Sequence, residues 1–317
     1  MRILKFGGKS LNTKEKMQNI CKYIKKIYKK DKKIIVVVSA IGKTTDELIA
    51  FAKHYVNENL TPRELDVLLS TGETQSSAIV AMMLNLNGIP AKSFQAFQIQ
   101  ATTFGAFQNS KIAHLNKENF DECFKQNTVA VVAGFQGINK KNEITTLGRG
   151  GSDTTAAAIG AVFNCDVEIY SDFDGVFCGD PRFLEFKKLK KLNHETMLSL
   201  ALAGAKVLDH RAVNISKKFG FNIVSKSSTL PFHTGSLVSE IESDVVAISS
   251  IDELCKVSIV FSNESKLKFI AKNVIFLTNN FKFYNLTINS NKITFMVKQE
   301  NKNEIIQILS KKLNLLK

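Results

Sequence analysis

The stretch TTLGRGGSD, residues 145–153, is the most informative part of this chain for predicting its fold. Three glycines, Arg149, Ser152 and Asp153 fall within its last six residues, and an alanine-rich helical pattern follows at 154–161. Glycine lets backbone N–H groups come close to an anion, and the N-terminus of a helix adds partial positive charge. An arginine can also hold a carboxylate or a phosphate through two parallel hydrogen bonds. The stretch therefore predicts a site for a small anion at the start of a helix.

The composition is that of a chain able to build a substantial core. It has 317 residues, 44% of them hydrophobic, which suits one large domain with a smaller one, or two of similar size. No apolar run approaches the ~20 residues of a membrane span, and no signal-peptide pattern opens the chain. The five cysteines lack a CxxC pair, and the five histidines do not cluster. We therefore expect a cytoplasmic protein without a membrane partner, a disulfide framework or a metal site of its own.

The formal net charge of +14 raises the question of a nucleic-acid partner. Only five of the 43 basic residues are arginine, and the lysines are spread over helix faces like a solvated surface. No motif combines aromatic with basic residues, so we expect no nucleic-acid partner. Because the chain nearly always uses lysine, Arg149 and Arg182 stand out. Both lie in turns rich in glycine or aspartate, which indicates a need for guanidinium geometry.

Apolar patterns before about residue 240 alternate between strands and helices. Nearly continuous apolar runs predict strands covered on both faces, and i, i+3, i+4 spacing predicts the helices between them. Strands are expected at 2–6, 34–38, 129–133, 167–170 and 222–226, and helices at 12–30, 45–56, 63–69, 73–86, 194–203 and 209–218. This alternation is typical of an α/β sheet.

The character of the chain changes after about residue 240. Segments 256–261 and 292–297 have the pattern of strands, and 303–313 has the apolar spacing of an amphipathic helix. We therefore expect two domains, residues 1–240 and a small α+β unit at 241–317.

Polar or glycine-containing segments stand at predicted strand ends or helix starts. They are Lys5–Ser10, Ser39–Asp46, Ser70–Glu73, and Gly134–Gly137 followed by the opening stretch. In an open α/β sheet, ligands bind at the carboxyl ends of the strands, so these segments are expected to share one site.

Two familiar phosphate-binding motifs are incomplete in this chain. Gly42-Lys43-Thr44 resembles the end of a P-loop, but the glycine required five residues earlier is Val37. The third glycine of the Rossmann fingerprint is replaced by Asp153. Phosphate binding is therefore expected to use another architecture.

The ordered set of segments resembles the aspartate kinases of the amino-acid kinase superfamily. The matching pieces span residues 1 to about 235: KFGG (5–8), Ser39 with TTDEL (44–48), STGE (70–73), GFQG (134–137), TTLGRGGSD (145–153), YSDFDGV (170–176), DPR (180–182) and GAKVL (204–208). A single piece could arise by chance, whereas the whole set in this order is specific.

The resemblance implies a fold and a reaction. The fold is a three-layer αβα sandwich with a mainly parallel central sheet, followed by a small ACT-like unit. The reaction transfers the γ-phosphoryl group of ATP to L-aspartate, giving 4-phospho-L-aspartate on the way to lysine or diaminopimelate, threonine and methionine. Mg²⁺ would be carried with the nucleotide, and a homodimer or higher homo-oligomer is expected.

The resemblance also implies a role for each matching side chain. Lys5 and Lys206 match lysines on the phosphates, and Asp153 matches the carboxylate that orders them. Arg149 matches the clamp on the substrate α-carboxylate, and Glu73 matches the acceptor for its ammonium group. The remaining matches are substrate contacts at Ser39, Thr45 and Ser152, and nucleotide contacts at Gly7, Gly8, Ser171, Asp172, Phe177, Asp180 and Arg182 besides the two lysines.

Alternatives stay open at this point. Lys5 could reach solvent from a strand end, Glu73 could simply favour a helix dipole, and Asp172 could belong to an ordinary turn. Other candidate functions are a superfamily kinase acting on glutamate, acetylglutamate, carbamate or a nucleotide, and a catalytically silent binding regulator. An amino-acid substrate needs one fixed cation and one fixed anion, and Arg149 with Glu73 favours aspartate.

The chain departs from the family pattern at a few positions. Lys9 stands where threonine is usual, Phe177 where tyrosine is usual, and Asp209-His210 where His-Pro is usual before Arg211. The carboxylate of Asp209 would be unfavourable near phosphates unless it faces away from them. After residue 240 there is room for about one shortened ACT-like unit, where the family commonly has two, so we expect weak or no feedback inhibition by lysine or threonine.

Overall fold

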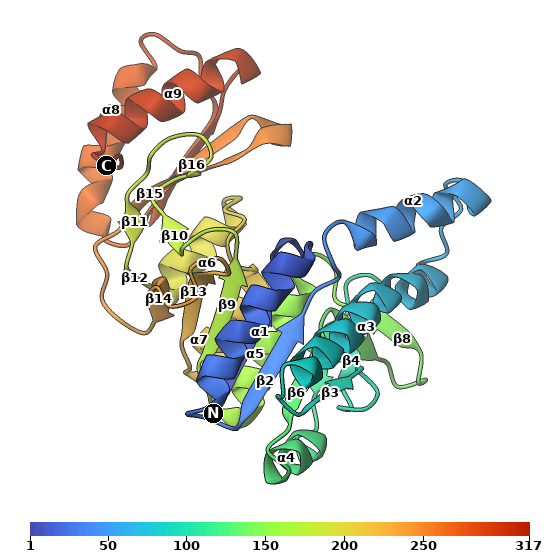
Figure 1. Cartoon of the computed structure of the whole chain (residues 1–317). Coiled ribbons are helices and arrows are strands. Elements are labelled where there is room, and N and C mark those ends of the chain that lie inside the picture. The colour runs from blue at the N-terminus through green and yellow to red at the C-terminus, as the bar shows by residue number, and fades with distance from the viewer.

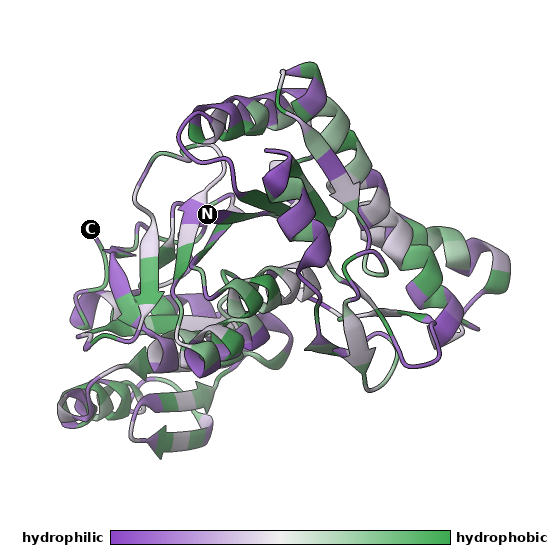
Figure 2. Cartoon of the chain, turned by 90° about the horizontal axis from the view of Figure 1, so that it is seen from below, coloured by the Kyte–Doolittle hydropathy of each residue, from purple (hydrophilic) through white to green (hydrophobic).

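The computed structural model describes residues 1–317 and is built around an eight-stranded sheet. In spatial order its strands are β12 (Lys191–Asn193), β14 (Ser236–Ser239), β13 (Ile223–Ser227), β9 (Val167–Ser171), β1 (Arg2–Phe6), β2 (Ile34–Val38), β6 (Val129–Ala133) and β3 (Ala91–Phe94). All neighbours are parallel except β13 with β14. Every residue of β2 and β6 is buried, and the central strands are largely green in Figure 2, as expected of strands covered on both faces.

Helices pack on both faces of this sheet (Figure 1). Leu4 and Phe6 of β1 pack with α1 (Lys14–Tyr28) and α3 (Pro62–Leu86), whereas Ile3 points to the other face. That other face carries α4 (Glu118–Lys125), α5 (Gly151–Phe163), α6 (His194–Leu202) and α7 (His210–Phe219). The predicted α/β class, a three-layer αβα sandwich with a mainly parallel sheet, is confirmed.

The predicted strands of the first 240 residues all exist, with small shifts at their ends. The prediction of separate helices at 63–69 and 73–86 is wrong, because α3 runs unbroken through both segments. The hydroxyls of Ser70 and Thr71 donate to carbonyl oxygens one turn earlier in the same helix, at 2.8 and 2.6 Å. Gly72 packs closely, since a Cβ there would lie 2.9 Å from the Cβ of Ala40. A polar segment with a glycine thus stays helical through local bonds and close packing.

Several short elements had no clear signal in the sequence. A second sheet has the order β5 (Lys111–His114), β4 (Thr102–Phe104), β7 (Gln136–Ile138) and β8 (Ile144–Thr146). A hairpin joins β10 (Val176–Phe177) to β11 (Lys188–Leu189).

Helix α2 (Thr44–Val56), predicted at 45–56, projects from the body and has no buried residue (Figure 1). No helix has both the length and the apolar character to cross a membrane.

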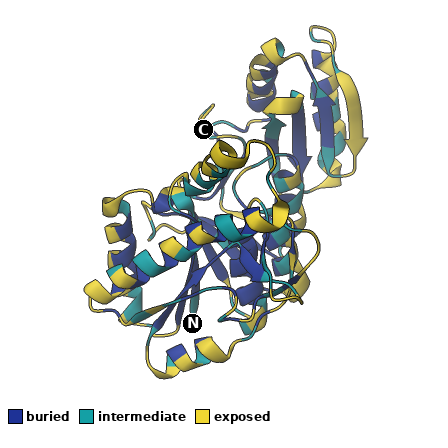
Figure 3. Ribbon diagram, turned by 90° about the vertical axis from the view of Figure 1, so that its right-hand side faces the viewer, coloured by how far each residue is buried: buried dark blue, intermediate teal, exposed yellow.

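The C-terminal part contains an antiparallel sheet with helices on one side (Figure 1). Its order is β15 (Val246–Ile251), β16 (Lys256–Phe261), β18 (Lys292–Met296) and β17 (Tyr284–Asn289), with α8 (Leu267–Leu277) and α9 (Gln299–Lys312). Figure 3 shows β17 as an exposed outer strand. Cys178 and Phe186 belong to the same core cluster as these elements, whereas Val245 and Ala247 belong to the main core. Apolar packing therefore crosses residue 240, and the predicted division there stays a prediction.

Candidate active site

Many predicted site residues lie where neighbouring parallel strands end. Lys5 is near the end of β1, Ser39 follows β2, and Ser171 ends β9. The strands β9, β1, β2 and β6 are adjacent, so their carboxyl ends form one edge of the sheet. Two helices begin near this edge. Thr45 lies in the first turn of α2, and Ser152 lies in the first turn of α5.

Lys5 and Asp153 form an ion pair at this edge. The Lys5 ammonium lies 2.7 Å from Asp153 Oδ1, and the two side chains are 12% and 9% exposed. Asp153 stands in the first turn of α5, where the helix dipole favours a carboxylate. Its Oδ2 accepts the backbone N–H of Asp209 at 3.2 Å. The pair therefore links the end of β1 to α5 and to the segment that precedes α7.

The glycine-rich stretch connects β8 to α5. Gly148 and Gly150 both have φ of 72°, in the left-handed region that favours glycine. A Cβ at Gly134 would lie 2.8 Å from the Cβ of Ser152, so the end of β6 approaches the start of α5 closely. At Gly8, next to Gly7, a Cβ would overlap the Ala40 carbonyl. These glycines allow the segments around the site to approach one another closely.

Glu73 lies in the middle of α3, which corrects the predicted placement of Ser70–Glu73 at a strand end or a helix start. Glu73 is 4% exposed. Its Oε1 accepts the Ala40 N–H at 3.0 Å, while Oε2 has no hydrogen-bond partner. Burial raises the pKa of this carboxyl to about 7, although the Ala40 N–H and the charge of Lys5 act in the opposite direction. Because Ala40 follows the carboxyl end of β2, this hydrogen bond places Glu73 at the same edge of the sheet.

Arg149 lies at the protein surface, in contrast to the buried Glu73. Its side chain is exposed, and its guanidinium takes no part in the ion pairs or hydrogen bonds of the fold. Its backbone carbonyl, by contrast, accepts a hydrogen bond from Arg211. The stretch therefore presents an unpaired guanidinium that can receive a carboxylate.

The predicted nucleotide residues after β9 form a polar turn. The backbone N–H of Phe173 donates to Ser171 Oγ at 3.2 Å. The Lys9 ammonium lies 3.8 Å from a carboxylate oxygen of Asp172, so the unusual lysine faces this turn. Phe177 is half-buried against the C-terminal core cluster.

Further along, Arg182 and Asp180 make a bidentate pair. Nε lies 2.9 Å from Oδ1 and Nη2 lies 2.6 Å from Oδ2. The hydrogen bonds and charge of Arg182, with a smaller effect of Lys206, hold the pKa of Asp180 below its usual value. Lys206 itself is exposed on the loop before α7. The positive charge of Lys206 thus acts on the predicted nucleotide residue Asp180.

The structure shows where the unusual Asp209 points. Its carboxylate accepts the backbone N–H of Arg211 at 2.9 Å and so caps α7. It also pairs with the Arg211 side chain, at 2.9 Å from Nε. The added negative charge is therefore neutralised inside the protein.

Two residues with structural importance for the site were missed in the sequence. Arg211 was one of only five arginines, and that scarcity was the signal that could have found it. Asp66 is fully buried on α3 and accepts hydrogen bonds from the backbone N–H groups of Gln108 and Thr146, at 3.0 and 2.7 Å, and from the Thr146 hydroxyl at 2.8 Å. No sequence motif marks Asp66, because its role depends on loops that are far away in the chain.

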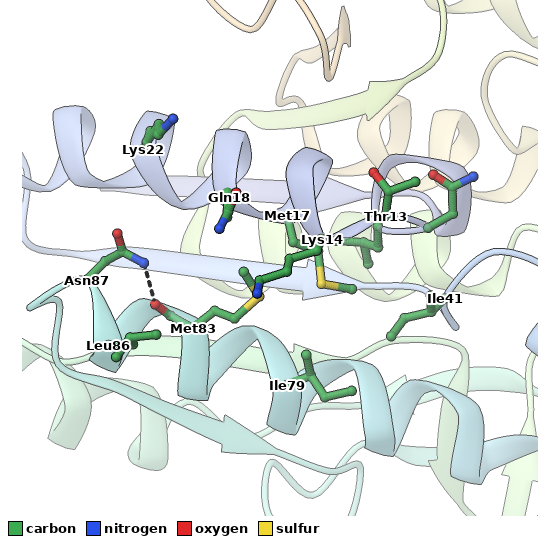
Figure 4. Close-up of a pocket in the computed structure, with 12 residues that line it drawn as sticks. Thr13, Lys14, Met17, Gln18, Lys22, Ile41, Ile79, Met83, Leu86 and Asn87 are labelled. Carbon is green, nitrogen blue, oxygen red and sulfur yellow. Dashed lines mark hydrogen bonds between the residues drawn. The ribbon is translucent and has the colours of Figure 1, made fainter.

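A separate hollow of about 650 Å³ lies between α1 and α3 (Figure 4). Lys14 and Met83 point into it, and half of its 12 lining residues are hydrophobic. None of the predicted site residues lines it. Its surroundings lack the paired charges of the sheet edge, so it is not the candidate active site.

No group of three or more His, Cys, Asp or Glu side chains is placed to hold a metal ion. Two carboxylates of the site are engaged in ion pairs: Asp153 with Lys5 and Asp180 with Arg182.

Comparison with known proteins defines the class. The model of the amino acid kinase family matches residues 1–224, so the chain belongs to that family. An aspartokinase of Bacillus sp. strain MGA3 is 35% identical over 327 residues, covering 99% of this chain and 79% of the relative. Within the family, the chain thus belongs with the aspartokinases.

Other similarities agree with this placement. An aspartokinase of Thermus thermophilus is 43% identical over 241 residues, covering 75% of this chain. The chain spans only 59% of the length of that relative. A crystal structure of E. coli aspartokinase III in complex with aspartate and ADP, in the R-state, has a TM-score of 0.85 at 18% identity and covers 99% of this chain and 100% of its own. At that identity the likeness supports the fold.

Proposed function

We propose that the chain transfers the γ-phosphoryl group of MgATP to the side-chain carboxylate of L-aspartate, giving ADP and 4-phospho-L-aspartate. Membership of the aspartokinases supports this activity, and the E. coli aspartokinase III structure is a complex with aspartate and ADP. The reaction would be the first step towards lysine or diaminopimelate, threonine and methionine.

The single observation that carries the proposal is the unpaired carboxylate oxygen of Glu73. A buried acceptor without a donor is costly, and a substrate ammonium group would remove that cost. The charge of Lys5 acts on Glu73, and Lys5 is also paired with Asp153 at the start of α5. The amino-acid end and the phosphate end of the proposed site therefore share one lysine.

Phosphoryl transfer requires mainly that the protein align the two substrates and supply positive charge around the migrating group. With Arg149 on the α-carboxylate and Glu73 on the ammonium group, the free side-chain carboxylate of aspartate is directed toward Lys5. One of its oxygens forms a bond to the γ-phosphorus while the bond from that phosphorus to the β,γ-bridging oxygen breaks, and ADP leaves with the electron pair. Lys5 and Lys206 stabilise the charge on the migrating group, and Asp153 orients Lys5.

We propose that Mg²⁺ is carried with the nucleotide, since no group of three or more His, Cys, Asp or Glu side chains is placed to hold it and Asp153 and Asp180 are paired with Lys5 and Arg182. When bound, it would offset phosphate charge. Gly7, Gly8, Ser171, Asp172 and Phe177 would contact the nucleotide with the Asp180–Arg182 pair, and Ser39, Thr45 and Ser152 would make the smaller substrate contacts.

Trapping of the acyl phosphate with hydroxylamine tests the activity. Purified protein with ATP, Mg²⁺ and L-aspartate is expected to form aspartyl hydroxamate, and Lys5→Ala is expected to lower kcat by roughly 10²–10³-fold. Lys111→Ala, on an exposed strand position, serves as the matched control. A panel with glutamate, acetylglutamate, carbamate and nucleoside monophosphates follows. Turnover of one of these in place of aspartate would refute the assignment.

The remaining properties are proposals of the same kind. We propose an ACT-like unit at 241–317, supported by its antiparallel sheet with helices on one side, and a homodimer or higher homo-oligomer. Five free cysteines without a disulfide support a cytoplasmic location. Weak feedback inhibition stays a prediction, which titration of the purified protein with lysine and with threonine measures.

A further inference from the structure

The side chain of Arg211 reaches the glycine-rich stretch from α7. Its Nη1 donates to the carbonyl oxygen of Leu147, and its Nη2 donates to the carbonyl oxygen of Arg149. Both bonds fall on the short segment that carries the proposed substrate guanidinium. The Arg211 side chain is 21% exposed, so these bonds are partly shielded from water.

Asp209 fixes the orientation of that guanidinium. It accepts from Arg211 Nε at 2.9 Å and from Nη2 at 3.2 Å, and it is 12% exposed. Its own position is set by the N-cap of α7, by the Thr154 hydroxyl at 3.4 Å and by the hydrogen bond from its N–H to Asp153. A Cβ at Gly150 would overlap the Asp209 carboxylate, so the glycine lets the two segments touch.

The segment is held at its other end by α3. Asp66 binds the backbone N–H and the hydroxyl of Thr146, immediately before Leu147. The backbone carbonyl of Gln108, also held through Asp66, would lie 2.6 Å from a Cβ at Gly148. Between these points Arg211 supplies the side-chain hydrogen bonds to residues 147–149.

We propose that Arg211 is a positioning residue for the amino-acid substrate: oriented by Asp209, it fixes the backbone on both sides of Gly148 and thereby aims Arg149 at the substrate α-carboxylate. The inference rests on the proposed function for the identity of that substrate. Lysine cannot take this place, because a single ammonium group lacks the planar fork that serves a carboxylate and two carbonyls together. The departure from His-Pro to Asp209-His210 thus gives this chain a carboxylate partner for Arg211.

Kinetics of Arg211→Lys and Arg211→Ala test the role. Both variants are expected to raise the KM for aspartate by about tenfold or more, because charge-assisted hydrogen bonds that hold Arg149 are lost. The KM for ATP is expected to change by less than about threefold, since the lysines on the phosphates are untouched. Millimolar guanidinium is expected to restore part of the aspartate affinity of Arg211→Ala. Arg63→Lys, an exposed arginine paired with Glu64 and Glu143, is the matched control and is expected to behave as the parent.

Hydrogen–deuterium exchange gives a second readout that needs no activity. Amides of residues 145–151 are expected to exchange faster in Arg211→Lys by about tenfold, and to stay unchanged in Arg63→Lys. Equal rises of both KM values, or unchanged exchange in this segment, would overturn the positioning role. A parent protein without hydroxamate formation would refute the proposed function instead, and exchange would still decide whether Arg211 holds the stretch.

Discussion

The two charges proposed to hold the amino acid sit in opposite surroundings. Arg149 is exposed, on a glycine-rich stretch whose shape is set by side chains from α3 and α7. Glu73 is 4% exposed and lies inside the 25-residue helix α3, whose regular backbone fixes its position. The desolvation cost therefore falls on the anion and not on the cation.

This difference teaches how each end of the site acquires its geometry. At the Glu73 end, secondary structure supplies the position and burial supplies the strength of the interaction. At the Arg149 end, tertiary hydrogen bonds supply the position and the charge stays hydrated until a ligand arrives. Substitutions at the two ends should therefore affect affinity, pH dependence and stability differently.

Glu73→Gln should have the largest effect on affinity. The amide keeps the shape of the side chain but cannot act as the anionic partner of an ammonium group. We expect kcat/KM for aspartate to fall by roughly 10²-fold, because a buried charge-assisted hydrogen bond is lost. Steady-state kinetics measure this, with Glu64→Gln, an exposed glutamate of the same helix, as the control. A change of less than threefold would remove Glu73 from the site.

For the Arg149 end, the sequence predicted a glycine-rich stretch at the start of a helix, and α5 confirms that position. Glycines, arginine and aspartate in a few residues before a helix are a local pattern, and local patterns survive folding. The central strands were predictable for a similar reason, since an all-apolar run such as 129–133 must be buried on both faces.

The Glu73 end could not be placed in the same way. Ser70, Thr71 and Gly72 have the composition of a loop, but they continue the helix, with hydroxyl bonds to the previous turn and close packing of Gly72 on Ala40. Asp66 and Arg211 were missed because their partners are tens of residues away. Short strands form only by pairing with neighbours, β4 with β5 and β8 with β7, and no single segment reveals such pairing.

The next largest effect should be the change of kcat/KM for aspartate with pH. Since burial raises the pKa of Glu73 to about 7, the ionised fraction that can bind an ammonium group rises about tenfold from pH 6 to pH 8. We expect kcat/KM for aspartate to follow this rise and Glu73→Gln to lack it. A flat profile in the parent protein would mean that the Arg149 end, with no such titration, dominates binding.

Stability should respond to pH with the opposite sign. The pKa of Glu73 is raised from 4.5 to about 7 in the folded state, so the protonated form stabilises the fold. That contribution is complete below about pH 4.5 and is lost as the pH rises through 7. At pH 8 the free energy of unfolding of Glu73→Gln should thus exceed that of the parent by an amount on the order of 3 kcal/mol, which raises its unfolding temperature, and the gap should shrink towards pH 5. Calorimetry at both pH values measures it, and a constant gap would contradict the burial argument.

Gly148→Ala probes the shape of the stretch with a moderate effect. Gly148 has φ of 72°, and an added Cβ would lie 2.6 Å from the Gln108 carbonyl oxygen. Gly88 has φ of 74° with nothing within 4 Å, so Gly88→Ala isolates the backbone strain. Gly88→Ala should lose about 1–2 kcal/mol of stability from backbone strain alone, Gly148→Ala should lose more because of the contact with Gln108, and only Gly148→Ala should also raise the KM for aspartate. Equal KM values would show that the conformation of the stretch does not matter for the substrate.

The smallest effect is expected from Arg149→Ala on stability. The guanidinium is exposed and takes part in no ion pair of the fold, and the carbonyl that Arg211 binds belongs to the backbone, which the substitution keeps. The free energy of unfolding should therefore stay within about 0.5 kcal/mol of the parent value, as for an ordinary surface position. Denaturant titration measures this beside the aspartate KM, which should rise by about tenfold because the carboxylate clamp is gone. A loss of several kcal/mol would mean that the Arg149 side chain, like that of Glu73, is part of the folded core of the site, and the contrast between the two ends would disappear.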